Sequence, residues 1–285
     1  MLIVGGTGFL GKRLVKASLE NGHDTYILQR PEIALDIDKI QMLISFKMQG
    51  AHLVHASFND HRSLVDAVKL VDVVICAISG VYGRSHQILL QLKLVEAIKE
   101  AGNIKRFLPS EFGSDSARMG DALEPGRITF DDKMVVRKAI GEANIPFTYV
   151  VANCFACYFL AGLCQLFQFL PARDSVVFLG DANQKGMKYH SLRIIHKQLS
   201  KRRQPMKILR VKTFIYCAKK NFYAVSFNSC TSIMYIYQVG LGHYYNVCYE
   251  GCLANFEIGE DEEEASKLYP EVNYTTAEDY LKRYV

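Results

Sequence analysis

The segment 5–11, Gly-Gly-Thr-Gly-Phe-Leu-Gly, has the residue types and spacing of a loop that binds phosphate. Three glycines recur every three residues, an apolar run at 2–4 precedes them, and Leu14, Val15 and Leu19 follow at helical spacing. Glycine lets the backbone turn tightly and approach a pyrophosphate, whose charge is favoured by free N–H groups at a helix start. The pattern predicts a Rossmann dinucleotide site rather than a glycine-rich turn without ligand, formed by Gly5, Gly6, Thr7, Gly8, Phe9, Leu10 and Gly11.

Arg30 follows the second predicted strand, 24–29, where the adenosine ribose of a dinucleotide is expected. An NAD enzyme usually places Asp or Glu here to accept from the ribose 2′-OH, whereas arginine offers a planar fork to a 2′-phosphate. Lys39, on the next helical stretch, could reach the same phosphate. The alternative is that these cations are ordinary solvated side chains. We predict that the cofactor is NADPH.

A hydride donor needs a side chain that moves a proton in step with it. Short-chain dehydrogenases usually use Tyr-x-x-x-Lys, and the single match, Tyr216 with Lys220, lies too late in the chain. Lys133, at the start of a predicted helix 131–143, is the better candidate, because burial or a nearby cation can lower the pKa of a lysine and make it a base. The alternative is a solvated helix lysine.

The elements that would position these residues alternate between strand and helix from residue 1 to about 155. Such alternation predicts an α/β fold with a doubly wound parallel sheet, which binds ligands at the carboxyl ends of its strands. We expect a NADP-binding Rossmann domain at 1–155 and a smaller substrate lobe at 156–285. The predicted strands are 2–5, 24–29, 52–57, 71–78, 106–109 and 147–152, and the predicted helices are 9–21, 36–49, 61–69, 86–101 and 131–143.

The composition of the 285 residues is that of a soluble globular protein. The eight cysteines lie mostly in apolar runs and no secretory segment precedes the first strand, so we expect reduced thiols in the cytoplasm. We expect no metal site, because Cys154 and Cys157 have no histidine nearby. The apolar run 147–170 contains polar residues and favours a strand followed by a buried helix over a membrane span.

The charge pattern changes abruptly between Ala182 and Tyr249, where no Asp or Glu occurs among 68 residues that include twelve lysines and arginines. About one residue in eight is acidic at average usage, so a globular lobe of this kind is improbable. A basic face that binds nucleic acid or membrane is one explanation, and an ordinary basic lobe is another. We favour a third, an altered reading frame or retained intron, and expect neither nucleic acid nor membrane as a partner.

The segments 5–11, 28–31, 106–113, 117–134 and 249–253 together resemble the plant isoflavone-reductase-like NADPH reductases. These are NmrA-type atypical short-chain dehydrogenases, which lack the usual catalytic tyrosine. The resemblance covers about 1–186 and 239–285 and fails at 187–238, which overlaps the stretch without carboxylates. We therefore expect 187–238 to be aberrant relative to the family.

The resemblance implies NADPH-dependent reduction of a benzylic ether in a small phenolic lignan by a cytoplasmic homodimer. Lys133 stands at the place of the family's general base. Removal of the phenol proton lets the benzylic C–O bond break to a quinone methide, which accepts hydride. Arg30, Lys39 and Arg137 match cofactor contacts, and His243 matches a histidine on the substrate side.

Two alternatives to lignan reduction stay open. The first is a sister activity of the same family, on isoflavones or on phenylcoumaran benzylic ethers, because fold and cofactor motifs do not separate these substrates. The second is a non-catalytic NADP-binding regulator or an inactive variant, against which Lys133 argues.

Overall fold

The structure is a computed structural model that describes residues 1–31, 36–80, 86–153, 208–210, 239–240, 242–243, 246 and 258–273. The described residues divide into two compact units. The first unit holds 1–110 and 132–149, and the second unit holds 111–131 and the described residues from 150 onward.

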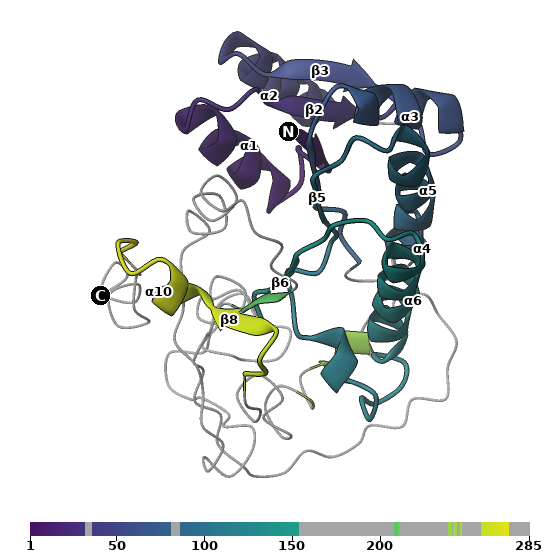
Figure 1. The fold of residues 1–285 in the computed structure, drawn as a ribbon. Coiled ribbons are helices and arrows are strands. Elements are labelled where there is room, and N and C mark those ends of the chain that lie inside the picture. Colours follow the sequence, from purple (N-terminus) through teal and green to yellow (C-terminus); the bar gives the residue numbers. More distant parts are fainter. Residues whose placement is uncertain are drawn as a thin grey trace, which may run out of the picture. The chain divides into compact units, whose positions relative to one another are not determined.

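The first unit is built on a parallel five-stranded sheet with the order β3-β2-β1-β4-β5 (Figure 1). The chain adds β2 and β3 on one side of β1 and then returns to add β4 and β5 on the other side. This reversal between β1 and β4 is the switch point at which doubly wound sheets bind ligands. The strands are β1 Leu2–Val4, β2 Tyr26–Gln29, β3 His52–His55, β4 Val73–Cys76 and β5 Arg106–Leu108.

Helices connect these strands as crossovers. Asp36 and Asp60 begin α2 and α3, each with a carboxylate oxygen that accepts a hydrogen bond from a first-turn N–H group. Gly102 ends α5 in the left-handed conformation, with φ of 68°. The helices of this part are α1 Gly11–Glu20, α2 Ile37–Met48, α3 His61–Lys69, α4 His86–Leu89, α5 Gln91–Ala101 and α6 Ile128–Glu142.

The core of the first unit lies between the sheet and its helices. All three residues of β1 are at most 1% exposed, as parallel strands covered on both faces require. Helix α3 packs against α5 through apolar residues at helical spacing. On α3 these residues are Leu64, Val65 and Val68, and on α5 they are Leu94, Val95 and Ile98.

The second unit contains a three-stranded sheet with the order β6-β7-β8. Its strands are β6 Tyr149–Val151, β7 Ile208–Arg210 and β8 Glu262–Glu264, and β7 runs parallel to β8. The second unit also contains the short elements η2, Ser116–Arg118, and α10, Ala265–Leu268. Strand β7 lies inside the 187–238 segment, so three residues of that segment form a ladder with an acidic strand.

The predicted α/β fold with a doubly wound parallel sheet is confirmed. Several strands and helices are shorter than predicted. In addition, the predicted helix 86–101 is interrupted at Leu90 and α6 begins at Ile128 rather than 131. The predicted strand 147–152 bridges β5 at Phe147 and then continues as β6 in the second sheet. In the described part of the chain, no helix has both the length and the apolar character needed to cross a bilayer.

Candidate active site

The glycine loop lies between β1 and α1, at the carboxyl edge of the sheet. Gly5 has φ of 85°, and a Cβ there would lie 2.8 Å from the Ala77 carbonyl oxygen. A Cβ on Gly11 would lie 1.9 Å from the Gly5 carbonyl oxygen, which no relaxation of a side chain can relieve. The loop is closed by a hydrogen bond from Gly8 N–H to Gly5 O of 2.9 Å. Glycine is thus required at positions 5 and 11 by the backbone itself.

This geometry fits a dinucleotide pyrophosphate. The first intrahelical bond of α1 runs from Lys12 N–H to Gly8 O, at 3.0 Å, so the loop immediately precedes the helix start. Phosphate binds at such a helix start because of its N–H groups and its partial positive charge. Residues 5–11 would hold the pyrophosphate, as the sequence predicts.

Arg13 contributes to this loop and was missed by the sequence analysis. Its Nη1 donates to the Phe9 carbonyl oxygen at 2.6 Å, and its guanidinium carbon lies 4.0 Å from the centre of the Phe9 ring. The spacing of four residues across the start of α1 was the available signal. Arg13 therefore orders the loop and adds a positive charge beside it.

Arg30 and Lys39 both lie near the end of β2, but their surroundings differ. Arg30 directly follows β2 and is half-buried. Lys39 lies in the first turn of α2, where its ammonium group forms an ion pair with Asp36. The hydrogen bond from Lys39 is the main cause that holds the pKa of Asp36 below its ordinary value. Asp36 would compete with a 2′-phosphate for Lys39.

Lys133 and Arg137 lie one turn apart on the buried face of α6. Their exposed fractions are 8% and 9%, and they share this face with Phe130, Val136 and Ile140. The Arg137 guanidinium carbon lies 4.4 Å from the centre of the Tyr149 ring. A lysine and an arginine on one buried face are side chains of the kind that bind a phosphate or a phenolate. Lys133 is therefore buried, whereas the alternative considered from the sequence was a lysine exposed to solvent.

His243 lies in the second unit against the loop before α6. Its Nε2 is 3.0 Å from the Gly126 carbonyl oxygen, and because a carbonyl only accepts, Nε2 carries the hydrogen and donates. The Phe130 ring packs on the imidazole with 5.1 Å between ring centres. A Cβ on Gly126 would lie 3.1 Å from His243 Cδ2, so glycine permits this close approach. The imidazole is held in a fixed orientation.

The other candidates from the sequence have different outcomes. Tyr216 and Lys220, like Cys154 and Cys157, lie outside the described residues. Burial raises the pKa of the Cys76 thiol to about 12, so this cysteine stays protonated and is no nucleophile. Among the described residues, no three His, Cys, Asp or Glu side chains are grouped as metal ligands. Within the first unit, the candidate site residues are the glycine loop, Arg30, Lys39, Lys133 and Arg137, and His243 is a separate candidate within the second unit.

The parallel sheet, its switch point and the glycine loop define a Rossmann-type dinucleotide-binding protein. Residues 1–178 match the model of the NmrA-like family. The chain is 62% identical over 307 residues to a bifunctional pinoresinol-lariciresinol reductase from Linum corymbulosum, with 100% of this chain and 97% of the relative covered. This protein belongs to the NmrA-like family.

Solved structures agree with this assignment. The complex of AtPrR2 with NADP+ and (+)-pinoresinol is 47% identical, has a TM-score of 0.89, and is matched over 100% of this chain and 98% of that one. An isoflavone reductase is 33% identical with a TM-score of 0.85, at the same coverage.

Proposed function

We propose that this chain is an NADPH-dependent reductase that opens the benzylic ethers of a lignan, converting pinoresinol to lariciresinol and then to secoisolariciresinol. The observation that carries the proposal is the 62% identity, along the whole chain, to a reductase of this name. The buried Lys133 on a fold with a complete glycine loop supports it. Among the solved structures, the higher identity to AtPrR2 (47%) than to the isoflavone reductase (33%) favours a lignan over an isoflavone, while a Lupinus albus relative named an isoflavone reductase homolog is 58% identical.

Lys133 would act as the general base of this reaction. Its Nζ takes the proton of the substrate phenol, and the electron pair released drives the para-benzylic C–O bond to break. The ether oxygen leaves as an alkoxide, which takes up a proton, and the ring becomes a quinone methide. Bound NADPH would supply the hydride that the benzylic carbon accepts. Hydride addition restores the aromatic ring as a phenolate, which takes back the proton held by Lys133 Nζ, while the alkoxide takes its proton from solvent. The product is then a phenol with one opened ether.

The cofactor would be held by residues of the first unit. The glycine loop would bind the pyrophosphate, with Arg13 ordering Phe9 beside it. Arg30 would pair with the 2′-phosphate through a charge-assisted contact. Lys39 would reach the same phosphate once it exchanges Asp36 for this stronger anion. Arg137 matches a further cofactor contact of the family, and His243 would orient the substrate.

Replacing Lys133 tests the proposal directly. Lys133→Ala should reduce turnover of pinoresinol by at least about a hundredfold, because general base catalysis contributes 10²–10⁴-fold. Its NADPH dissociation constant should stay within about threefold of the wild type. Steady-state kinetics and fluorescence titration measure the two quantities.

Lys138→Ala is the matched control, since Lys138 lies on the same helix with its side chain 77% exposed. Lys138→Ala should keep the wild-type turnover of pinoresinol and the wild-type NADPH dissociation constant. Full activity of Lys133→Ala would contradict the role given to Lys133, and an inactive wild type that still binds NADPH would favour the non-catalytic regulator.

The substrate class needs its own comparison. Wild-type protein should reduce pinoresinol with a larger kcat/KM than a phenylcoumaran or an isoflavone, assayed with NADPH at one protein concentration. A preference for either of the other substrates would identify the sister activity.

We also propose a homodimer in the cytoplasm. The family resemblance and the predicted reduced state of the cysteines support these two expectations. Light scattering after size exclusion tests the first, and a fluorescent fusion in plant cells tests the second.

A further inference from the structure

A buried amide connects the ends of two strands at the carboxyl edge of the first unit's sheet. Gln91 is the first residue of α5 and is 1% exposed. Its Oε1 accepts from Ser110 N–H at 2.7 Å, and its Nε2 donates to the Ile88 carbonyl oxygen at 3.2 Å. A buried polar group is stable only when it is hydrogen-bonded, so both bonds are needed.

The connection extends from Ser110 to the neighbouring strand. Ser110 follows β5 by two residues, and its Oγ donates to the carbonyl oxygen of Ile78 at 2.5 Å. Ile78 in turn follows β4 by two residues. Gln91 therefore fixes the loop after β5 directly and the loop after β4 through Ser110. All of these residues are buried within one unit.

The position of this connection determines what it can influence. A dinucleotide crosses the sheet at the switch point, with its adenosine half over β2, where Arg30 lies, and its other half over β4 and β5. Among the described residues, the hydrogen bonds that start at Gln91 thus lead to the loops on the nicotinamide side. Side chains behind a site hold its contacting groups in their productive geometry.

We propose that Gln91 is a positioning residue that sets the loops beside the nicotinamide half of the cofactor. This inference rests on the proposed use of NADPH. Glutamine suits the role because a neutral amide can accept from Ser110 and donate to Ile88 at the same time. Methionine has a similar length but can do neither, and ionised glutamate can only accept.

The test compares two ligands that share the adenosine half. Titrations of the full chain with NADPH and with adenosine 2′,5′-bisphosphate give two dissociation constants for each variant. Gln91→Met should raise the NADPH dissociation constant about tenfold, because the buried N–H group of Ser110 loses its hydrogen-bond acceptor on the nicotinamide side of the sheet. The dissociation constant of the bisphosphate, which lacks the nicotinamide, should change by less than about twofold.

Asn103 provides a control at the opposite edge of the same two strands. Its Nδ2 donates to the Val71 carbonyl oxygen at 2.7 Å, which connects the segments before β5 and β4. Asn103→Ala should leave the ratio of the two dissociation constants unchanged.

Gln91→Glu supplies a second variant if the methionine protein does not fold. A protonated glutamic acid can both accept and donate a hydrogen bond, as glutamine does. The ratio of the NADPH dissociation constant to the bisphosphate dissociation constant in Gln91→Glu should therefore approach the wild-type ratio at acidic pH and depart from it at alkaline pH. The inference would be overturned if Gln91→Met raised both dissociation constants equally, or if it changed neither of them. A wild type that binds NADPH but does not reduce pinoresinol would defeat the proposed function alone, whereas one that does not bind NADPH would contradict both.

Discussion

At the scale of single residues, we expect Arg30 to determine which nicotinamide cofactor the site prefers. It is half-buried at the end of β2, where its charge would pair with a 2′-phosphate that NADH lacks. A charge-assisted contact of this kind contributes about 1.5–3 kcal/mol. Arg30→Ala should therefore raise the NADPH dissociation constant about ten- to a hundredfold and leave NADH almost unchanged.

Fluorescence titration with both cofactors measures this preference. Arg62→Ala is the control, since Arg62 is an exposed arginine on α3 whose Nε pairs with Asp66 at 3.2 Å. Equal losses for NADPH and NADH in Arg30→Ala would show that Arg30 does not recognise the 2′-phosphate.

Two glycines show how the same substitution acts differently in two elements. Gly11 opens α1 with no room for a Cβ, whereas a Cβ on Gly141 in α6 meets nothing within 4 Å. Gly11→Ala should lower the free energy of unfolding by about 3 kcal/mol through steric strain. Gly141→Ala should raise it by about 0.5 kcal/mol, because alanine favours helix. Urea denaturation of both variants checks the opposite signs.

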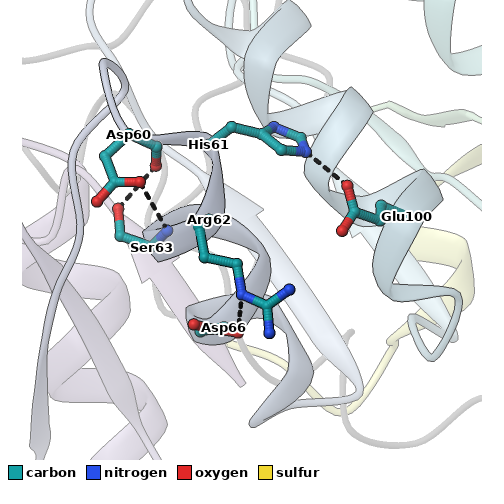
Figure 2. A network of polar contacts seen from close by, with 6 residues as sticks. All are labelled: Asp60, His61, Arg62, Ser63, Asp66 and Glu100. Carbon is teal, nitrogen blue, oxygen red and sulfur yellow. Dashed lines mark hydrogen bonds and ion pairs between the residues drawn. The ribbon is translucent and has the colours of Figure 1, made fainter.

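Helices α3 and α5 are joined at their surface by a side-chain hydrogen bond. Figure 2 shows His61 of α3 and Glu100 of α5, whose Nε2 and Oε2 atoms are 2.7 Å apart, beside the Asp60 cap of α3. The hydrogen bond with His61 is the main cause that holds the pKa of Glu100 below its ordinary value. Because the pKa of Glu100 is lower in the folded protein than in the unfolded chain, where it is 4.5, its contact with His61 stabilises the fold at a pH above 4.5. This stabilisation is lost as the pH falls through the pKa of Glu100 in the folded protein.

Replacing this carboxylate should therefore have a pH-dependent effect. Glu100→Gln should lower Tm slightly at neutral pH, because exposed pairs contribute little, and the difference from the wild type should vanish in strong acid. Differential scanning fluorimetry over pH 2–8 measures it. Glu20→Gln on α1 corrects for the loss of one surface charge. A Tm difference between Glu100→Gln and the wild type that grows as the pH falls would contradict the stabilising role given to Glu100.

The whole chain combines a well-formed Rossmann unit with a stretch whose composition does not suit a globular lobe. The runs 214–216, 222–225 and 233–237 are bulky and apolar without matching polar faces, and they lie outside the described residues. Only 208–210 of the 187–238 segment is described, as a strand beside Glu262–Glu264. The prediction that this segment is aberrant stays a prediction.

Limited proteolysis of the full chain tests that prediction. Chymotrypsin should cut first within 187–238, after exposed aromatic residues, and leave a resistant fragment close to 1–155. Mass spectrometry of a time course locates the cuts. A single protected chain with ordinary turnover of pinoresinol would show that 187–238 is a native lobe, and the transcript across codons 186 and 239 would show whether the reading frame is altered.

The sequence by itself determined the features that are encoded by neighbouring residues. The glycine spacing, the alternation of strands and helices and the position of Arg30 at a strand end all follow from local rules of conformation and burial. The position of Lys133 at a predicted helix start made it a candidate base, and the resemblance to a family supported that role. The same resemblance selected Arg137 and His243, which no local rule would have distinguished from other cations and histidines.

Only the tertiary structure decided which distant groups meet. Gln91 lies 19 residues from Ser110, and His243 lies 117 residues from Gly126, so no periodicity could reveal either hydrogen bond. The physical reason is that a polar side chain buried by folding must find a partner, and the packing of the elements determines which partner is within reach.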